Sequence, residues 1–309
     1  MARVLAILCS GRRKGYTATV LSHAVEGADS VEGVKTEWIH LQDYTLKPCT
    51  SCFHCLRDPE RRCPLDDDFG RNGKGILLRK VRGANGMILA DPVHMWGATA
   101  TCHLFTERTY SLRWTGRLRG MPLMTISCAT NQGFQLEAQR TLTRWAFTGG
   151  YRYVGGLPVH ASYFGEALKK ATVLGRKLGR LAVRDATKGR KPYSEAERFR
   201  AYLDECWSGL HFYIENLSDG TYSLPSSLPE RALRDRTFRR PEAISLLEKA
   251  RNEFAETLRW YEEKDLRKAC RYLARASAFW THATWLEFLE ERVIKAPPPK
   301  IYRPLPGKG

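Results

Sequence analysis

The sequence predicts an α/β protein with a doubly wound, five-stranded parallel sheet and an added C-terminal α-helical region. Short apolar runs alternate with amphipathic stretches from residue 3 to about 185, which is the pattern of a parallel sheet covered by helices. A polar segment follows at 187–192, and beyond it apolar residues recur at helical spacing. With 309 residues, 43% of them hydrophobic, the chain can bury a full core and divide into two units.

Five short apolar runs are the predicted strands, at 4–9, 34–40, 86–91, 122–128 and 151–155. Helical stretches separate or follow them at 17–26, 98–112, 135–148 and 165–184. Strands that are apolar throughout are typical of a sheet buried on both faces. Because ligands of such sheets bind beyond the carboxyl ends of the strands, we expect functional residues in the loops after Cys9, Asp91 and Cys128.

The C-terminal part has the apolar spacing of helices, predicted at 195–217, 242–263 and 265–295. Ser194 and Glu197 have the spacing of a capping box, and prolines at 225 and 229 predict a loop over 218–240. The many aromatic residues of the last helices indicate a bundle core, or else a surface that covers a substrate pocket or another subunit. We therefore expect domains at 1–187 and 188–295 and an extended or disordered tail at 296–309.

The charge is strongly positive, with 50 Lys and Arg against 33 Asp and Glu and a net charge of +17. Such a surface attracts anionic partners at low salt. The cations are scattered, and no RRM, KH or helix-turn-helix signature is present, which disfavours a nucleic-acid function. Neither a membrane-length apolar run nor a signal-peptide cleavage site is found, and we expect a cytoplasmic protein with no membrane association.

Four cysteines, Cys49, Cys52, Cys55 and Cys63, have the spacing C-x2-C-x2-C-x7-C inside the loop 47–66. Three closely spaced thiolates and a fourth from a return segment can bind the four corners of a 4Fe-4S cluster. A zinc site usually pairs two C-x2-C hooks across a longer gap. The spacing favours the iron-sulfur cluster, with zinc and chemically inert cysteines as the alternatives. His54 lies between two of the cysteines and is expected beside the cluster or facing solvent.

The segment 10–17, Ser-Gly-Arg-Arg-Lys-Gly-Tyr-Thr, joins the first predicted strand to a helix. Hydroxyl groups, cations and free N–H groups at a helix N-terminus are suited to a phosphate. The same residues also suit a capped, solvated loop. The spacings GxxxxGK[ST] and GxGxxG are missing, which disfavours ATP and a dinucleotide.

Together, the segment 10–17, the cysteine motif and the segment 91–97, Asp-Pro-Val-His-Met-Trp-Gly, resemble a known family. In order and spacing the chain is similar to the iron-sulfur flavoprotein branch of the NADPH-dependent FMN reductase superfamily, which is flavodoxin-like. The similarity covers roughly residues 1–185. The chain departs from the family pattern at Cys9, Tyr16 and His94, where Gly, Asn and Tyr are usual. The loop 129–133 also lacks the run of glycines that is usual in the family.

The resemblance implies an FMN phosphate held by Ser10, Arg12 and Thr17. It implies that the isoalloxazine ring is held by Pro92, Val93, His94, Met95, Trp96 and Gly97. It also implies a third loop that closes over the flavin, formed by Ala129, Thr130, Asn131, Gln132 and Gly133. His94 is either a catalytic proton donor or a residue that packs beside the ring.

The function implied is that of an FMN-dependent oxidoreductase. It would pass electrons between a 4Fe-4S cluster, FMN and a small-molecule substrate or redox partner, with NADPH or ferredoxin as the electron donor. In members of the family the cluster approaches the flavin of a neighbouring subunit, so we expect a homodimer or homotetramer. A basic nucleic-acid-binding protein with a structural cluster and a pure electron carrier are the alternatives.

Overall fold

A computed structural model describes residues 1–307, and the last two residues of the predicted 296–309 tail lie outside the described residues. The chain divides into two compact units, residues 1–193 and the residues from Ser194 onward. Over the described residues no helix is both long and apolar enough to cross a membrane.

The first unit is built on a parallel sheet with the strand order β2-β1-β3-β5-β6. Its strands are β1 (Ala2–Leu8), β2 (Val34–His40), β3 (Gly86–His94), β5 (Pro122–Ala129) and β6 (Arg152–His160). This order is that of a flavodoxin-like sheet, and it confirms the predicted doubly wound fold. A sixth strand, β4 (Gly97–Ala98), pairs antiparallel with the end of β3. Its two residues are too few to show a periodicity in sequence.

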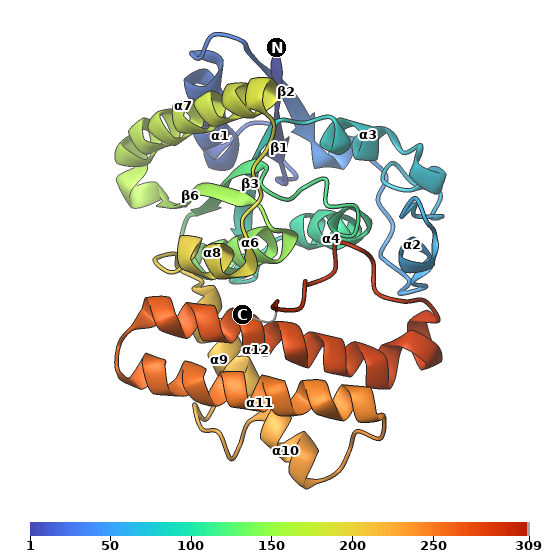
Figure 1. Cartoon of the computed structure of the whole chain (residues 1–309). Helices are drawn as coiled ribbons and strands as arrows, with labels where there is room; N and C mark the ends of the chain where they lie inside the picture. The colour runs from blue at the N-terminus through green and yellow to red at the C-terminus, as the bar shows by residue number, and fades with distance from the viewer. Residues whose placement is uncertain (308–309) are drawn as a thin grey trace. The chain divides into compact units, whose positions relative to one another are not determined.

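Helices cover both faces of this sheet. The helices α1 (Tyr16–Asp29) and α7 (Phe164–Lys188) pack together on one face, and α4 (Ala100–Arg108) and α6 (Gln135–Gly149) lie on the other (Figure 1). Shorter elements complete the unit, namely η1 (Leu41–Asp43), α2 (His54–Arg57), η2 (Arg71–Gly73), α3 (Ile76–Arg82), α5 (Tyr110–Arg113) and η3 (Ala161–Tyr163).

Glycines let α1 and α7 approach with their backbones in contact. A Cβ atom on Gly175 would lie 1.9 Å from the carbonyl oxygen of Ala24, and one on Gly27 would lie 2.0 Å from that of Thr172. Beneath them the strand β5 is buried along its whole length. The close packing holds α1 against the sheet, and with it the loop that precedes α1.

The second unit is helical, and several of its helices differ from the prediction. It contains α8 (Glu195–Ala201), α9 (Gly209–Leu217), α10 (Leu228–Arg234), α11 (Pro241–Glu262), α12 (Leu266–Thr284) and the π-helix η4 (Trp285–Ile294). The single helix predicted at 195–217 is wrong, because α8 ends at Ala201 and α9 starts only at Gly209. The predicted loop at 218–240 contains α10, since Ser227 caps it and Pro229 lies in its first turn, where its missing N–H is not needed.

Long apolar side chains of α11 and α12 form the interior of this helical unit. Leu247 and Phe254 of α11 and Leu273 of α12 are fully buried. The segment after η4 runs back along α12, where the Tyr302 hydroxyl donates a hydrogen bond to the carbonyl oxygen of Thr281 at 2.7 Å. The predicted capping box is present at the start of α8, between Ser194 and Glu197.

Candidate functional site

A cavity of about 190 Å³ lies beyond the carboxyl ends of β1, β3 and β5. Seven of the residues implied for FMN line it, namely Ser10, Arg12, Thr17, Pro92, Val93, His94 and Thr130. The structure adds Lys14, Gly15, Tyr16, Ala18 and Cys128 to this lining. The first and second flavin loops thus meet in one place, together with one residue of the third loop.

The loop before α1 has the features that a phosphate group requires. Ser10 is buried, and its Oγ accepts a hydrogen bond from the backbone N–H of Arg12 at 3.1 Å, which curls the loop. No side chain caps the N-terminus of α1 at Gly15. The first N–H groups of this 14-residue helix therefore face a cavity that also contains Arg12 and Lys14, and a dianionic phosphate fits such a donor set.

The second loop is a tight hairpin between β3 and β4. Met95 and Trp96 form its turn with left-handed φ angles of 46° and 64°. Such angles are strained for bulky residues, and strained turns concentrate at functional sites. Met95 is 87% exposed and Trp96 58% exposed. Neither lines the cavity, and Gly97 does not either.

The third loop lies beside the second. Trp96 Nε1 donates a hydrogen bond to Gln132 Oε1 at 3.1 Å. Ala129 is buried at the end of β5, while Asn131 and Gly133 have positive φ angles. Of the five residues implied here, only Thr130 lines the cavity, so the loop borders the cavity rather than closing over it.

A buried carboxylate group, that of Asp91, binds the residue that follows the hairpin. Asp91 accepts hydrogen bonds from the N–H and the hydroxyl of Thr99, at 2.9 and 2.6 Å. Burial raises the pKa of Asp91 to about 7, against the lowering effect of these bonds. Cys9 and Cys102 lie beside this carboxylate, and burial raises the pKa of the Cys9 thiol well above its usual value. The sequence singled out none of these three residues as functional.

The four cysteines of the motif line a second cavity of about 390 Å³. Burial, and then charge repulsion from the nearby Cys63, Cys49 and Cys52, together raise the pKa of the Cys55 thiol to about 12. In the described part of the chain, no three of these sulfurs lie within 4.8 Å of one another. Four thiol groups around one cavity are the donor set that a cluster of iron and sulfide requires.

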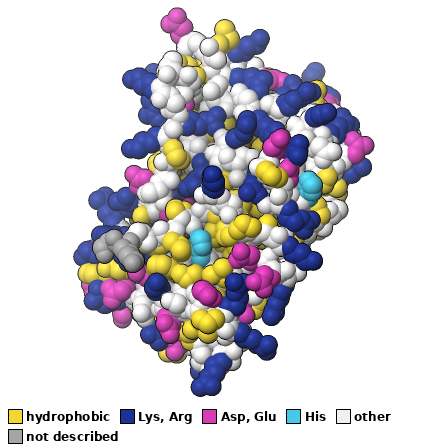
Figure 2. Space-filling view, turned by 45° about the vertical axis from the view of Figure 1, so that its right-hand side comes forward, with side chains coloured by type: hydrophobic (Ala, Val, Ile, Leu, Met, Phe, Trp, Pro, Cys, Tyr) yellow, Lys and Arg dark blue, Asp and Glu magenta, His cyan; other side chains and the backbone are white. Residues whose placement is uncertain are grey.

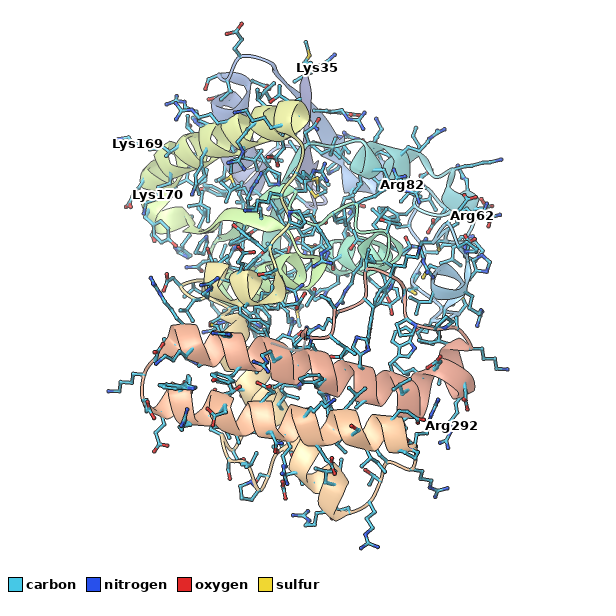
Figure 3. All side chains as sticks on the ribbon, viewed as in Figure 1. Lys35, Arg62, Arg82, Lys169, Lys170 and Arg292 are labelled. Carbon is cyan, nitrogen blue, oxygen red and sulfur yellow. The ribbon has the colours of Figure 1, made fainter. Side chains whose placement is uncertain are left out.

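Left-handed residues give the cysteine loop its path. Ser51 and Phe53 have φ angles of 51° and 53°, and Phe53 starts the one-turn helix α2. Farther along, Arg62 donates hydrogen bonds to Asp58, which lowers the pKa of that carboxyl group to about 2. Figure 3 labels Arg62 at the outer edge of this loop. His54 is half-buried in α2 and does not line the cavity.

A buried arginine also reaches the cysteine cavity. Arg108, the last residue of α4, donates from Nη1 to the Sγ atom of Cys63 at 3.3 Å and from Nη2 to Asp67 Oδ1 at 2.9 Å. Sequence reasoning missed Arg108 and Asp67, because they are 41 residues apart and neither belongs to the motif.

Comparisons with known proteins identify the family of the chain. The chain matches the NADPH-dependent FMN reductase family over residues 2–164. It is 34% identical over 140 residues to an iron-sulfur flavoprotein of Methanocaldococcus jannaschii, covering 45% of this chain and 68% of that protein. It is 27% identical over 180 residues to an iron-sulfur flavoprotein of Archaeoglobus fulgidus, covering 57% and 78%.

Among solved structures, a flavone reductase aligns with a TM-score of 0.46 at 19% identity, covering 63% of this chain and 67% of that one. Residues after 164 lie outside the family match. The match extends over more than half of the chain and includes the three loops and the cysteine motif described above. The chain therefore belongs to the NADPH-dependent FMN reductase family, within its iron-sulfur flavoprotein branch, and is an FMN-dependent oxidoreductase.

Proposed function

We propose that the cavity at 10–17 and 92–94 binds FMN and that Cys49, Cys52, Cys55 and Cys63 bind a 4Fe-4S cluster. The observation that carries this proposal is that each of the two residue sets lines a cavity of its own, and both cavities lie in the first unit. When bound, FMN supplies one- and two-electron chemistry, and the cluster supplies one-electron chemistry. The protein would then convert between single electrons and electron pairs for a small-molecule substrate or a redox partner.

The chain's own residues bind and orient in this proposal. Ser10, Thr17 and the N-terminus of α1 donate hydrogen bonds to the phosphate, and Arg12 neutralises its charge. Pro92 and Val93 place the ring against the end of β3. His94 is exposed at the cavity wall, where it can hold a proton for the ring or the substrate.

Helix α4 connects the two cavities. It begins next to the hairpin, with Thr99 as its N-cap, and it ends at Arg108 beside Cys63. At a rise of about 1.5 Å per residue, the two ends of the helix lie roughly 14 Å apart. One rigid element therefore sets the spacing between the flavin loop and the cysteine cavity.

We further propose that an acidic ferredoxin delivers electrons at the cysteine loop, with NADPH as the alternative donor. Cys52 is exposed, and Arg57 beside it donates to the Cys52 carbonyl oxygen at 2.7 Å. A cation at this edge and a net charge of +17 favour docking of an anionic protein. On the face drawn in Figure 2, Lys and Arg are spread widely instead of forming one stripe, which gives no support to a nucleic-acid groove.

The donor is tested by anaerobic reduction with NADPH and with reduced ferredoxin. A charge-reversed variant, R57E, should slow reduction by ferredoxin and leave reduction by dithionite unchanged, because a small reductant needs no basic docking surface. Equal rates for both proteins with ferredoxin would contradict docking at this edge. Efficient reduction by NADPH alone would favour the alternative donor.

For the assembly we propose a homodimer or homotetramer, as in family members whose cluster approaches a neighbouring flavin. Sedimentation of the purified protein at micromolar concentration tests this directly. A monomer that retains full activity would contradict the proposal.

A further inference from the structure

Arg108 is a charged residue that the fold buries almost completely. Its side chain is 2% exposed, and that of its partner Asp67 is 0% exposed. Arginine is almost never buried unless it is paired. A buried ion pair is often no more stabilising than apolar residues of the same volume. Stability alone therefore does not explain why this ion pair is present. The contact of Arg108 with Cys63 points to a role at the cysteine site.

Asp67 fixes the direction of the guanidinium group. Its Oδ2 atom accepts from the backbone N–H of Lys47 at 2.9 Å, and its Oδ1 atom accepts from that of Phe69 at 3.0 Å. These bonds join both ends of the cysteine loop to one carboxylate. Because Arg108 Nη2 is bound to the same carboxylate, Nη1 is directed at the sulfur of Cys63, 3.3 Å away.

The neighbouring arginine of the loop behaves differently. Arg57 is exposed and donates to the backbone carbonyl oxygen of Cys52 instead of to a sulfur. The two arginines therefore provide a comparison between a hydrogen bond to a cysteine ligand and a positive charge that is only nearby.

We propose that Arg108 is a positioning residue that raises the reduction potential of the cluster through its hydrogen bond to Cys63. This inference rests on the proposed cluster site. Reduction adds one negative charge to a cluster, and an N–H donor and a positive charge at a ligand sulfur stabilise the reduced form more than the oxidised one. The bond also distinguishes Cys63 from Cys52, whose neighbouring arginine donates to a backbone oxygen.

The test compares three variants by their midpoint potential, measured in an anaerobic spectroelectrochemical titration, and by their iron and sulfide content. R108K keeps the charge but loses the forked geometry that reaches both Asp67 and Cys63. The double variant R108Q/D67N replaces the ion pair with two amides and leaves no uncompensated buried charge. R57Q removes one exposed positive charge and no bond to sulfur.

We expect a lower midpoint potential in R108K and in R108Q/D67N, and a much smaller change in R57Q. If the net charge alone set the midpoint potential, R57Q would show the largest shift, because R108K and R108Q/D67N leave the net charge of the protein unchanged. Variants of Arg108 that contain a full cluster at the wild-type potential would overturn the proposal. So would a loss of the cluster from R108K, since that result indicates a role in assembly only. A wild-type protein without iron would instead refute the proposed cluster site itself.

Discussion

At the scale of single residues, Arg12 tests the assignment of the phosphate loop. A charge-assisted hydrogen bond is worth about 1.5–3 kcal/mol, so R12Q should weaken FMN binding by about 10- to 100-fold. Riboflavin lacks the phosphate, and its affinity should not change. The measurement is fluorescence titration of the protein without flavin.

The neighbouring Arg13 is the matched control for this change. It pairs with Asp43 and does not line the cavity. R13Q should therefore leave the FMN affinity close to that of the wild type. An equal loss for FMN and riboflavin in R12Q would mean that Arg12 acts elsewhere than on the phosphate.

Asp91 predicts a pH dependence of stability. Its pKa is about 7 in the folded protein and 3.8 in the reference state. Between these values the folded protein binds more protons than the unfolded chain, so the contribution of Asp91 to stability falls as pH rises from about 4 to 7 and is constant above that range.

The variant D91N isolates this contribution, because an amide can still accept the N–H of Thr99. The free energy of unfolding of wild type minus that of D91N should decrease between pH 4 and 7, as measured by urea denaturation. A difference that does not change over this range would show that Asp91 titrates normally.

At the scale of elements, the contact between α1 and α7 depends on glycine. A methyl group on Gly175 would overlap the carbonyl oxygen of Ala24, 1.9 Å away. We expect G175A to destabilise the protein by about 1–3 kcal/mol or more, because the backbones must separate. Thermal unfolding of the protein with its cofactors measures this.

Gly165, near the start of the same helix, provides the control. No atom lies within 4 Å of a Cβ added there. G165A should leave stability unchanged or raise it by up to about 1 kcal/mol, since alanine favours the helix. A destabilisation of similar size in both variants would contradict this account, because an added Cβ atom meets a neighbouring carbonyl oxygen at Gly175 and nothing within 4 Å at Gly165.

Elements also show what local sequence patterns can predict. The five parallel strands and the cysteine motif were predictable, because strand periodicity and ligand spacing lie within a few residues. The hairpin turn at Met95 and Trp96 was not, since such turns usually carry Asn and Gly. Helix α10 was missed because Pro229 was interpreted as a loop residue, whereas proline is also favoured in the first turn of a helix.

At the scale of the whole molecule, contacts between distant residues were beyond the sequence. The bond from Arg108 to Cys63 joins residues 45 positions apart, and no periodicity relates them. Likewise, the sequence implied three loops for the flavin, but only the fold shows that Met95, Trp96 and most of the third loop lie outside the cavity lining. Local spacing predicted the cysteine motif, whereas the contact of Cys63 with the distant Arg108 had no signal in the sequence.

The central claim is that one chain combines FMN with a 4Fe-4S cluster held by four cysteines. Quantification of iron, sulfide and flavin after anaerobic purification tests it most directly, for the wild type and for C55S. The account predicts about four irons, four sulfides and one FMN per wild-type chain, in keeping with four thiolate ligands. It also predicts a C55S protein that retains FMN and loses the intact cluster. Stoichiometric zinc without flavin in the wild type would contradict it.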